Sequence, residues 1–198
     1  MRHMLVEIQT EVPFNFAWEN RPSSLPFMDS PFKGLLVLLA LQKNFIDEES
    51  PVRMKGGKYI VLNVIKVVEV ARQRGILIVW NVGPASIGSK NAELVDGLVF
   101  REGDYKLVKT RFSAFFVTHL HLVLQGAGIN TLVVTSVQTP NCIRQTVFDV
   151  VALDYQHVIV LVDVTVAATP DIHLVNVIDM KNIGVVTKTL QEWSLIKA

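Results

Sequence analysis

The sequence has a single cysteine, Cys142, among its 198 residues, and this scarcity excludes a disulfide framework within the chain. It equally excludes the zinc sites that pair two cysteines. No charge sign is in excess, because 19 Lys and Arg stand against 18 Asp and Glu, so nothing indicates a nucleic-acid partner. We therefore expect a protein of a reducing, cytoplasmic compartment.

Long apolar runs are also missing. The longest, Leu35 to Leu41, suits a buried strand and is too short to span a membrane. The N-terminus lacks the apolar core of a signal peptide and carries acidic residues that a transit peptide avoids. We expect no membrane partner.

The chain divides by composition into an irregular N-terminal extension, residues 1–32, and one domain, residues 33–198. The extension is punctuated by proline and serine and sustains no period. Its aromatic residues leave open that it packs on a surface or on a partner subunit. The rest is rich in apolar residues and long enough for one sizeable core.

Apolar runs alternate with helical patterns along the domain. Strands expected from continuous apolar or β-branched runs lie at 35–39, 76–80, 105–109, 131–135, 157–162 and 184–187. Helices are expected at 58–72, 113–126, 140–154, from 170 onwards and at 190–193, with a short helix or turn at 92–98. This alternation predicts an α/β fold, a doubly wound three-layer sandwich on a mostly parallel sheet.

In an open parallel sheet, ligands bind beyond the carboxyl ends of the strands. Lys109 ends one predicted strand, and Cys142 begins the helix after another. An ammonium and a helix N-terminus would both stabilise a thiolate, so the two residues form a candidate nucleophile site. On the bare sequence, a buried structural cysteine and a solvated lysine are the more common alternatives.

The sequence contains no motif that indicates a metal site or a nucleotide-binding site. His119 and His121 lie two apart on a predicted helix and face different sides, whereas His157 and His173 are isolated and are interpreted as surface or helix-end residues. The spacing of Gly83 and Gly88 is not that of a phosphate loop. We predict no metal site and no cofactor.

Three stretches resemble the isochorismatase-like cysteine hydrolases, the family that includes nicotinamidases, and the likeness is greatest to plant nicotinamidase-like members. The stretches are LLVLLALQKNF (35–45), KTRFSAFF (109–116) and VVTSVQTPNCIRQTVFDVVALDY (133–155). The resemblance runs from about Gly34 to Trp193. It implies a six-stranded parallel sheet and a catalytic triad of Asp, Lys and Cys.

Carried over residue by residue, the resemblance makes Cys142 the nucleophile and Lys109 the stabiliser of the thiolate and transition state. The backbone amides of Gln138 and Cys142 would form the oxyanion hole, with a cis peptide bond between Val137 and Gln138. The residues that would contact substrate are Gln42, Phe45 and Asn141.

The chain departs from the family pattern at two places. Ala40 occupies the position of the triad Asp, two residues before Gln42, and alanine can neither take the thiol proton nor orient the lysine. The loop at residues 81–91 is short and has no histidine, so the pocket wall is expected to be incomplete and the metal site of some relatives absent. Altered splicing or gene modelling could equally have shortened it.

These observations leave three hypotheses for function. The first is a nicotinamidase-like hydrolase that is inactive or strongly impaired. The second is an active hydrolase of small amides, nicotinamide first, with a substitute base such as a loop carboxylate (Asp47 or Glu48) or water. The third is a non-catalytic binding or assembly subunit. The resemblance also implies a homo-oligomer, and a small amide-like molecule as the natural ligand.

Overall fold

The computed structural model describes residues 34–39, 41–51, 53–82 and 93–196, with only the backbone described for 34–39. The predicted extension at residues 1–32 lies outside this part. The strands are β1 (Gly34–Leu39), β2 (Leu77–Val82), β3 (Tyr105–Val108), β4 (Thr131–Val137), β5 (His157–Val166) and β6 (Val186–Lys188). The helices are η1 (Lys43–Phe45), α2 (Gly57–Gln73), α3 (Leu120–Gly126), η4 (Thr139–Ile143), α4 (Arg144–Ala152), α5 (Pro170–Asn182) and α6 (Leu190–Ser194).

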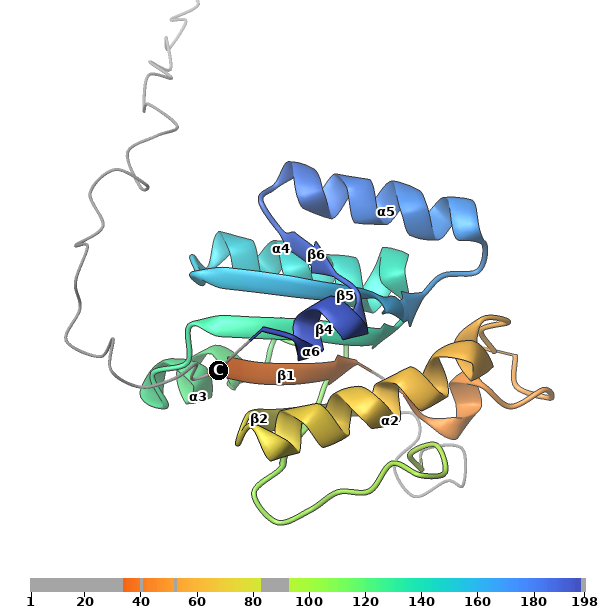
Figure 1. Cartoon of the computed structure of the whole chain (residues 1–198), viewed down its shortest axis with the longest axis horizontal. Coiled ribbons are helices and arrows are strands. Elements are labelled where there is room, and N and C mark those ends of the chain that lie inside the picture. Colours follow the sequence, from red (N-terminus) through yellow and green to blue (C-terminus); the bar gives the residue numbers. More distant parts are fainter. Residues whose placement is uncertain (1–33, 40, 52, 83–92, 197–198) are drawn as a thin grey trace, which may run out of the picture. The chain divides into compact units, whose positions relative to one another are not determined.

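The strands form one six-stranded sheet in the order β3-β2-β1-β4-β5-β6, and every neighbouring pair is parallel. Chain order reverses between β1 and β4, which is where a doubly wound sheet opens a crevice beyond its carboxyl ends. The predicted α/β class and parallel sheet are confirmed (Figure 1).

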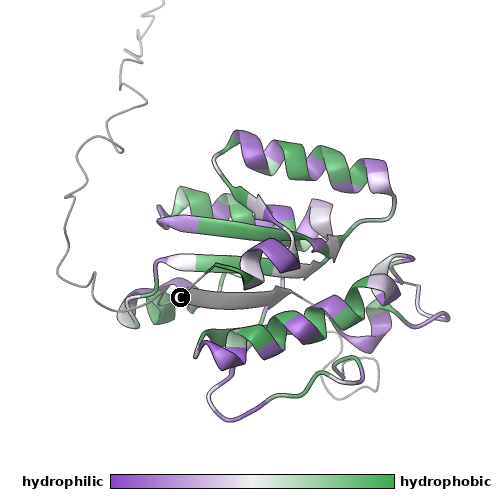
Figure 2. Ribbon diagram, viewed as in Figure 1, coloured by the Kyte–Doolittle hydropathy of each residue, from purple (hydrophilic) through white to green (hydrophobic). Residues whose placement is uncertain are grey.

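Helices cover both faces of the sheet, which explains why its central strands are apolar throughout. All seven residues of β4 are buried. One core cluster joins the sheet to α3, α4 and α5 through residues such as Leu124, Val147 and Met180. A second joins it to α2 and α6 through Val64 and Trp193. In Figure 2 the apolar colour marks much of the sheet and parts of the helices that pack on it.

The helix predicted for residues 113–126 is wrong in its first half, because helical structure begins only at Leu120. Side-chain hydroxyls form hydrogen bonds with backbone groups here. Ser113 Oγ accepts from Phe115 N at 3.0 Å, and Thr118 Oγ1 donates to Ala114 O at 2.7 Å. Val117 adopts a positive φ of 54°, a conformation that interrupts a right-handed helix. The segment after Lys109 is therefore a series of tight turns.

Several predicted boundaries also differ from those observed. Strand β2 continues through Asn81 and Val82, and β5 continues to Val166. The described residues of the segment predicted as a short helix or turn, 93–98, form a bridge to Gln42 and a turn. The last strand begins two residues later than predicted and ends one residue later, and the helix expected from Pro140 opens with the π-helical turn η4.

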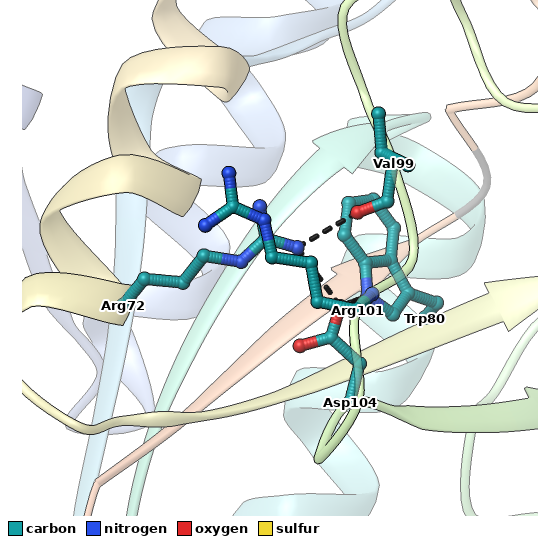
Figure 3. A network of polar contacts seen from close by, with 5 residues as sticks. All are labelled: Arg72, Trp80, Val99, Arg101 and Asp104. Carbon is teal, nitrogen blue, oxygen red and sulfur yellow. Dashed lines mark hydrogen bonds and ion pairs between the residues drawn. The ribbon is translucent and has the colours of Figure 1, made fainter.

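A polar network anchors the segment that leads into β3 (Figure 3). Asp104, whose side chain is 9% exposed, accepts hydrogen bonds from Arg72 at 2.9 Å and from the Trp80 indole at 2.8 Å. Its Oδ2 also accepts from the backbone N–H of Arg101 at 2.9 Å, and Arg72 donates to Val99 O at 2.7 Å. The network ties α2, β2 and residues 99–104 together just before β3, the strand that leads to Lys109.

Among the residues that the structure describes, no helix combines the length and apolarity needed to cross a membrane.

Candidate active site

Lys109 and Cys142 meet at the carboxyl edge of the sheet. Lys109 directly follows β3 and stays aligned with the sheet, because its N–H donates to Val82 O at 3.0 Å. Cys142 lies in η4, just beyond β4. The Lys109 Nζ is 3.2 Å from the Cys142 Sγ, so two residues 33 positions apart make direct contact. The sequence predicted that they would lie near each other.

The Lys109 ammonium is enclosed. The residue is 6% exposed, and Nζ donates to Arg111 O at 3.0 Å and to Phe112 O at 3.3 Å, besides its contact with Cys142. These three acceptors match the three donors of an ammonium. In the described part of the chain Lys109 has no carboxylate in ion-pair range, so the Cys142 sulfur is the group in contact that could supply a counter-charge. The lysine is therefore placed to stabilise negative charge on the sulfur.

The turn before Cys142 has an unusual backbone. The Val137–Gln138 peptide bond is cis, at the position where the family resemblance places one. Ser136 has a φ of 97°, and its buried hydroxyl has no hydrogen-bond partner within the described residues. A positive φ and an unpaired buried hydroxyl, both at Ser136, are typical of functional sites. Asn141 Nδ2 donates to Gln138 Oε1 at 2.8 Å and closes the turn.

Two threonines that sequence reasoning missed support this turn and the lysine segment. Thr146 Oγ1, fully buried on α4, accepts from Ala114 N at 3.0 Å and fastens the segment after Lys109 to the helix after Cys142. Thr139, also fully buried, hydrogen-bonds to His173 Nδ1 on α5 at 2.9 Å. Sequence spacing gives no sign of the second contact, which joins residues 34 positions apart.

His173 lies near the start of α5, one of the two positions that the sequence suggested, but it is not isolated. It is half-buried, and burial lowers the pKa of its imidazole, while a backbone hydrogen bond with Val162 raises it more weakly. A neutral ring can donate to the Val162 carbonyl and accept from the Thr139 hydroxyl at the same time. His173 thus links α5 to β5 and to the turn that carries the cysteine.

We expect His173 to make folding stability sensitive to acid. Because its pKa in the folded protein lies below the ordinary 6.5, the unfolded chain takes up this proton first as the pH falls. Its contribution is complete above pH 6.5 and is lost as the pH falls toward the lowered folded pKa. Urea unfolding at several pH values should show a smaller acid loss in His173→Asn than in wild type.

The matched control is His157→Asn, since His157 is exposed at the start of β5. It should keep the wild-type dependence on pH. An unchanged profile in His173→Asn would contradict the role given to the buried imidazole.

The other predicted site residues have varied outcomes. Ala40 lies outside the described residues, directly after β1. Gln42 is buried and pairs with Leu94, while the partly buried Phe45 packs against the core cluster on the α2 face. Asp163 lies within β5, although the strand predicted at 157–162 ended before it, and its carboxylate accepts from Leu190 N at 2.8 Å. Within the described structure, Asp163 makes no hydrogen bond or ion pair with Cys142.

The histidines of α3 also have partners of their own. His119 hydrogen-bonds to the Tyr105 hydroxyl, and His121 Nδ1 lies 3.0 Å from the Tyr155 hydroxyl. Burial raises the pKa of Tyr155 to about 12, which keeps its hydroxyl protonated as a donor. Within the described residues, no group of three or more His, Cys, Asp or Glu side chains could hold a metal ion.

A parallel doubly wound sheet with a cysteine and a lysine in contact at its carboxyl edge is the arrangement expected of a cysteine hydrolase of this fold. The chain belongs to the isochorismatase family, because the model of the Isochorismatase domain matches residues 34–192. The predicted family membership is confirmed.

Individual relatives agree with this assignment. An Arabidopsis thaliana protein named "Probable inactive nicotinamidase" is 54% identical over 183 residues, which cover 80% of this chain and 93% of the relative. The ureidoacrylate amidohydrolase RutB of Klebsiella pneumoniae is 29% identical, with 76% of this chain and 79% of that protein covered. The crystal structure of an isochorismatase family protein from Desulfovibrio vulgaris superposes with a TM-score of 0.77 at 30% identity, covering 81% of this chain and 96% of the other.

The Arabidopsis alignment is longer than the part of this chain that it covers, so the relative has residues without a counterpart here. A short loop between β2 and β3 would account for such a difference. The predicted short loop at 81–91 remains a prediction, because residues 83–92 lie outside the described part.

Proposed function

We propose that this chain is a nicotinamidase-like cysteine hydrolase whose amide hydrolysis is lost or strongly impaired. One observation carries the proposal: Lys109 contacts Cys142 at 3.2 Å, and no carboxylate reaches either residue within the described structure. The sequence places alanine at position 40, where the family has its Asp. The name of the Arabidopsis relative supports the same conclusion.

The chemistry identifies the step that would fail. The Cys142 thiolate attacks the amide carbonyl, a C–S bond forms, and the carbonyl electron pair moves onto oxygen, where the Gln138 and Cys142 amides would hold it. The C–N bond then breaks only if the nitrogen gains a proton, because an amide anion is a very poor leaving group. In the family the Asp supplies that proton, and water then hydrolyses the thioester. Losing a proton-transfer group costs about 10²- to 10⁴-fold in rate.

The carboxylates considered as substitute bases are occupied elsewhere. Glu48 pairs with Lys58 at 2.7 Å, and this hydrogen bond lowers the pKa of its carboxyl, which makes it a weaker base. Asp47 accepts from Glu49 N at 3.1 Å. Both line a surface cavity of about 290 Å³ whose walls include neither Lys109 nor Cys142. These contacts count against an active hydrolase that uses either residue.

The proposal predicts little or no ammonia release from amides by the wild-type chain. Purified protein should be assayed on nicotinamide and on ureidoacrylate, the substrate named for the Klebsiella relative, beside Cys142→Ala. Any ammonia release by wild type beyond that of Cys142→Ala should be slow, with a turnover number about 10²- to 10⁴-fold below the roughly 1–10³ s⁻¹ typical of enzymes. Turnover in that typical range, abolished by Cys142→Ala, would overturn the proposal.

A cytoplasmic location and a small amide-like ligand belong to the same proposal. The lone cysteine, kept next to a lysine as a free thiol, supports a reducing compartment. Self-association is a separate question, and it has structural support of its own.

A further inference from the structure

Helix α5 exposes an apolar outer face. Four large aliphatic residues on this 13-residue helix face solvent: Ile172 is 41% exposed, Leu174 57%, Val175 64% and Ile178 48%. The inner side is apolar as well, since Val177 and Met180 pack into the core. Figure 1 shows α5 as an outer helix of its layer, and Figure 2 shows apolar stretches alternating with polar ones along it. A surface helix normally keeps a polar face toward water, so this face is suited to a partner.

The charges on this helix are arranged by sign. At 100° per residue, Asp171, Leu174, Val175 and Ile178 share one stripe, with Lys181 at its edge. Asp171 is in the first turn and Lys181 in the last, about 15 Å apart at 1.5 Å per residue. Both are exposed, and neither has an ion-pair partner among the described residues. The other acidic residue near the C-terminus, Asp179, pairs with Arg144 of α4 at 2.7 Å.

We propose that α5 pairs with α5 of a second copy of this chain, antiparallel, in a two-fold symmetric dimer. Antiparallel pairing places Asp171 opposite the partner's Lys181 at each end and the aliphatic residues against one another in the middle. A negative charge at one end and a positive charge at the other make the helix complementary to itself, which a two-fold interface requires. A membrane surface fits less well, because interfacial helices carry several Lys or Arg on the polar face.

The paired surface is small. One helix pair buries less than the roughly 800 Å² per partner of a standard interface, so we expect a reversible dimer with a Kd in the order of micromolar. The outer residues of α5 make none of the contacts described for Lys109 and Cys142. The inference is therefore independent of the proposed function, and each can fail without the other.

Sedimentation equilibrium of the full chain tests this pairing. Val175→Glu places a charge at the apolar centre in both copies and should raise the dimer Kd by about a hundredfold. Asp171→Lys or Lys181→Asp alone opposes like charges at both ends and should raise the Kd by about tenfold at low salt. The double exchange Asp171→Lys with Lys181→Asp restores opposite charges and should return the Kd to within about threefold of wild type.

The double exchange also separates pairing from folding. It puts both charges at the ends of α5 that the helix dipole disfavours, so thermal unfolding should show a slightly less stable monomer while association recovers. A merely structural effect would weaken the double variant more than either single one.

A competing apolar surface supplies the matched control. Leu122 on α3 is 69% exposed, and Val117, five residues earlier in the chain, is 81% exposed. Leu122→Glu should leave the dimer intact. A wild-type chain that is monomeric at hundreds of micromolar, or a dimer dissociated by Leu122→Glu and not by Val175→Glu, would overturn the inference.

Discussion

Ala40→Asp raises the rate of Cys142-dependent ammonia release from nicotinamide by about 10²- to 10⁴-fold over wild type, the range that one proton-transfer group contributes. In the sequence, position 40 directly follows β1. This central strand lies between β2 and β4, and Lys109 and Cys142 meet at the carboxyl edge of the same sheet. A carboxylate there would take the thiol proton, pass it to the departing nitrogen and pair with the Lys109 ammonium. The measurement is kcat/KM for ammonia release.

Two variants control this gain. Ala40→Asn has nearly the same shape as Ala40→Asp and cannot carry the proton, so its rate should stay at the wild-type level. Ala40→Asp combined with Cys142→Ala should lose the gain entirely. If Ala40→Asp and Ala40→Asn turn over equally slowly, the missing carboxylate is not what limits this chain.

Asp104→Ala should lower the free energy of unfolding by about 3 kcal/mol. The change leaves the Arg72 guanidinium, 19% exposed in its side chain, without its ion-pair partner. It also leaves the Trp80 indole N–H and the Arg101 backbone N–H without the acceptor that they share. Breaking a largely buried pair from one side costs several times more than removing a surface charge. In a domain of this size the melting temperature should fall by roughly 6 to 12 °C.

Asp96→Ala is the matched control, because Asp96 pairs with Lys43 at 3.2 Å while its side chain is 93% exposed. That variant should change stability by less than about 0.5 kcal/mol. Calorimetry on both variants checks the difference. A melting temperature for Asp104→Ala equal to that of Asp96→Ala would show that the network of Figure 3 contributes little.

Much of the fold could be predicted because the sheet is buried on both faces. β4 illustrates this: all seven of its residues are buried, and the nearly continuous apolar and β-branched run at 131–135 is what a strand covered on both faces requires. The failure at residues 113–119 has a local cause, since Ser113 and Thr118 bond to nearby backbone and compete with a helix that the aliphatic spacing suggested.

The candidate site could be predicted in part, for a related reason. Lys109 and Cys142 follow two strands of one parallel sheet, so topology alone brings them to the same edge. The contact of His173 with Thr139 depends instead on how α5 packs over η4. Hydrophobic periodicity in the sequence does not predict such a tertiary contact. The hydrogen bonds of the Lys109 ammonium to Arg111 O and Phe112 O could not be predicted either, because every residue has a backbone carbonyl and the sequence does not distinguish the ones that accept.

The central claim is that the Cys142 nucleophile and its lysine remain while the proton-transfer group is gone, and the amide-to-ester rate ratio tests it most directly. When the thiol attacks a p-nitrophenyl ester, p-nitrophenolate leaves as a stable anion and needs no proton, whereas the amide nitrogen must gain a proton to leave as ammonia. We predict Cys142-dependent release of p-nitrophenol from p-nitrophenyl acetate by wild type, almost no ammonia from nicotinamide, and an amide-to-ester ratio that rises by about 10²-fold or more in Ala40→Asp. A ratio that is the same in wild type and Ala40→Asp, or an ester reaction that survives Cys142→Ala unchanged, would contradict the claim.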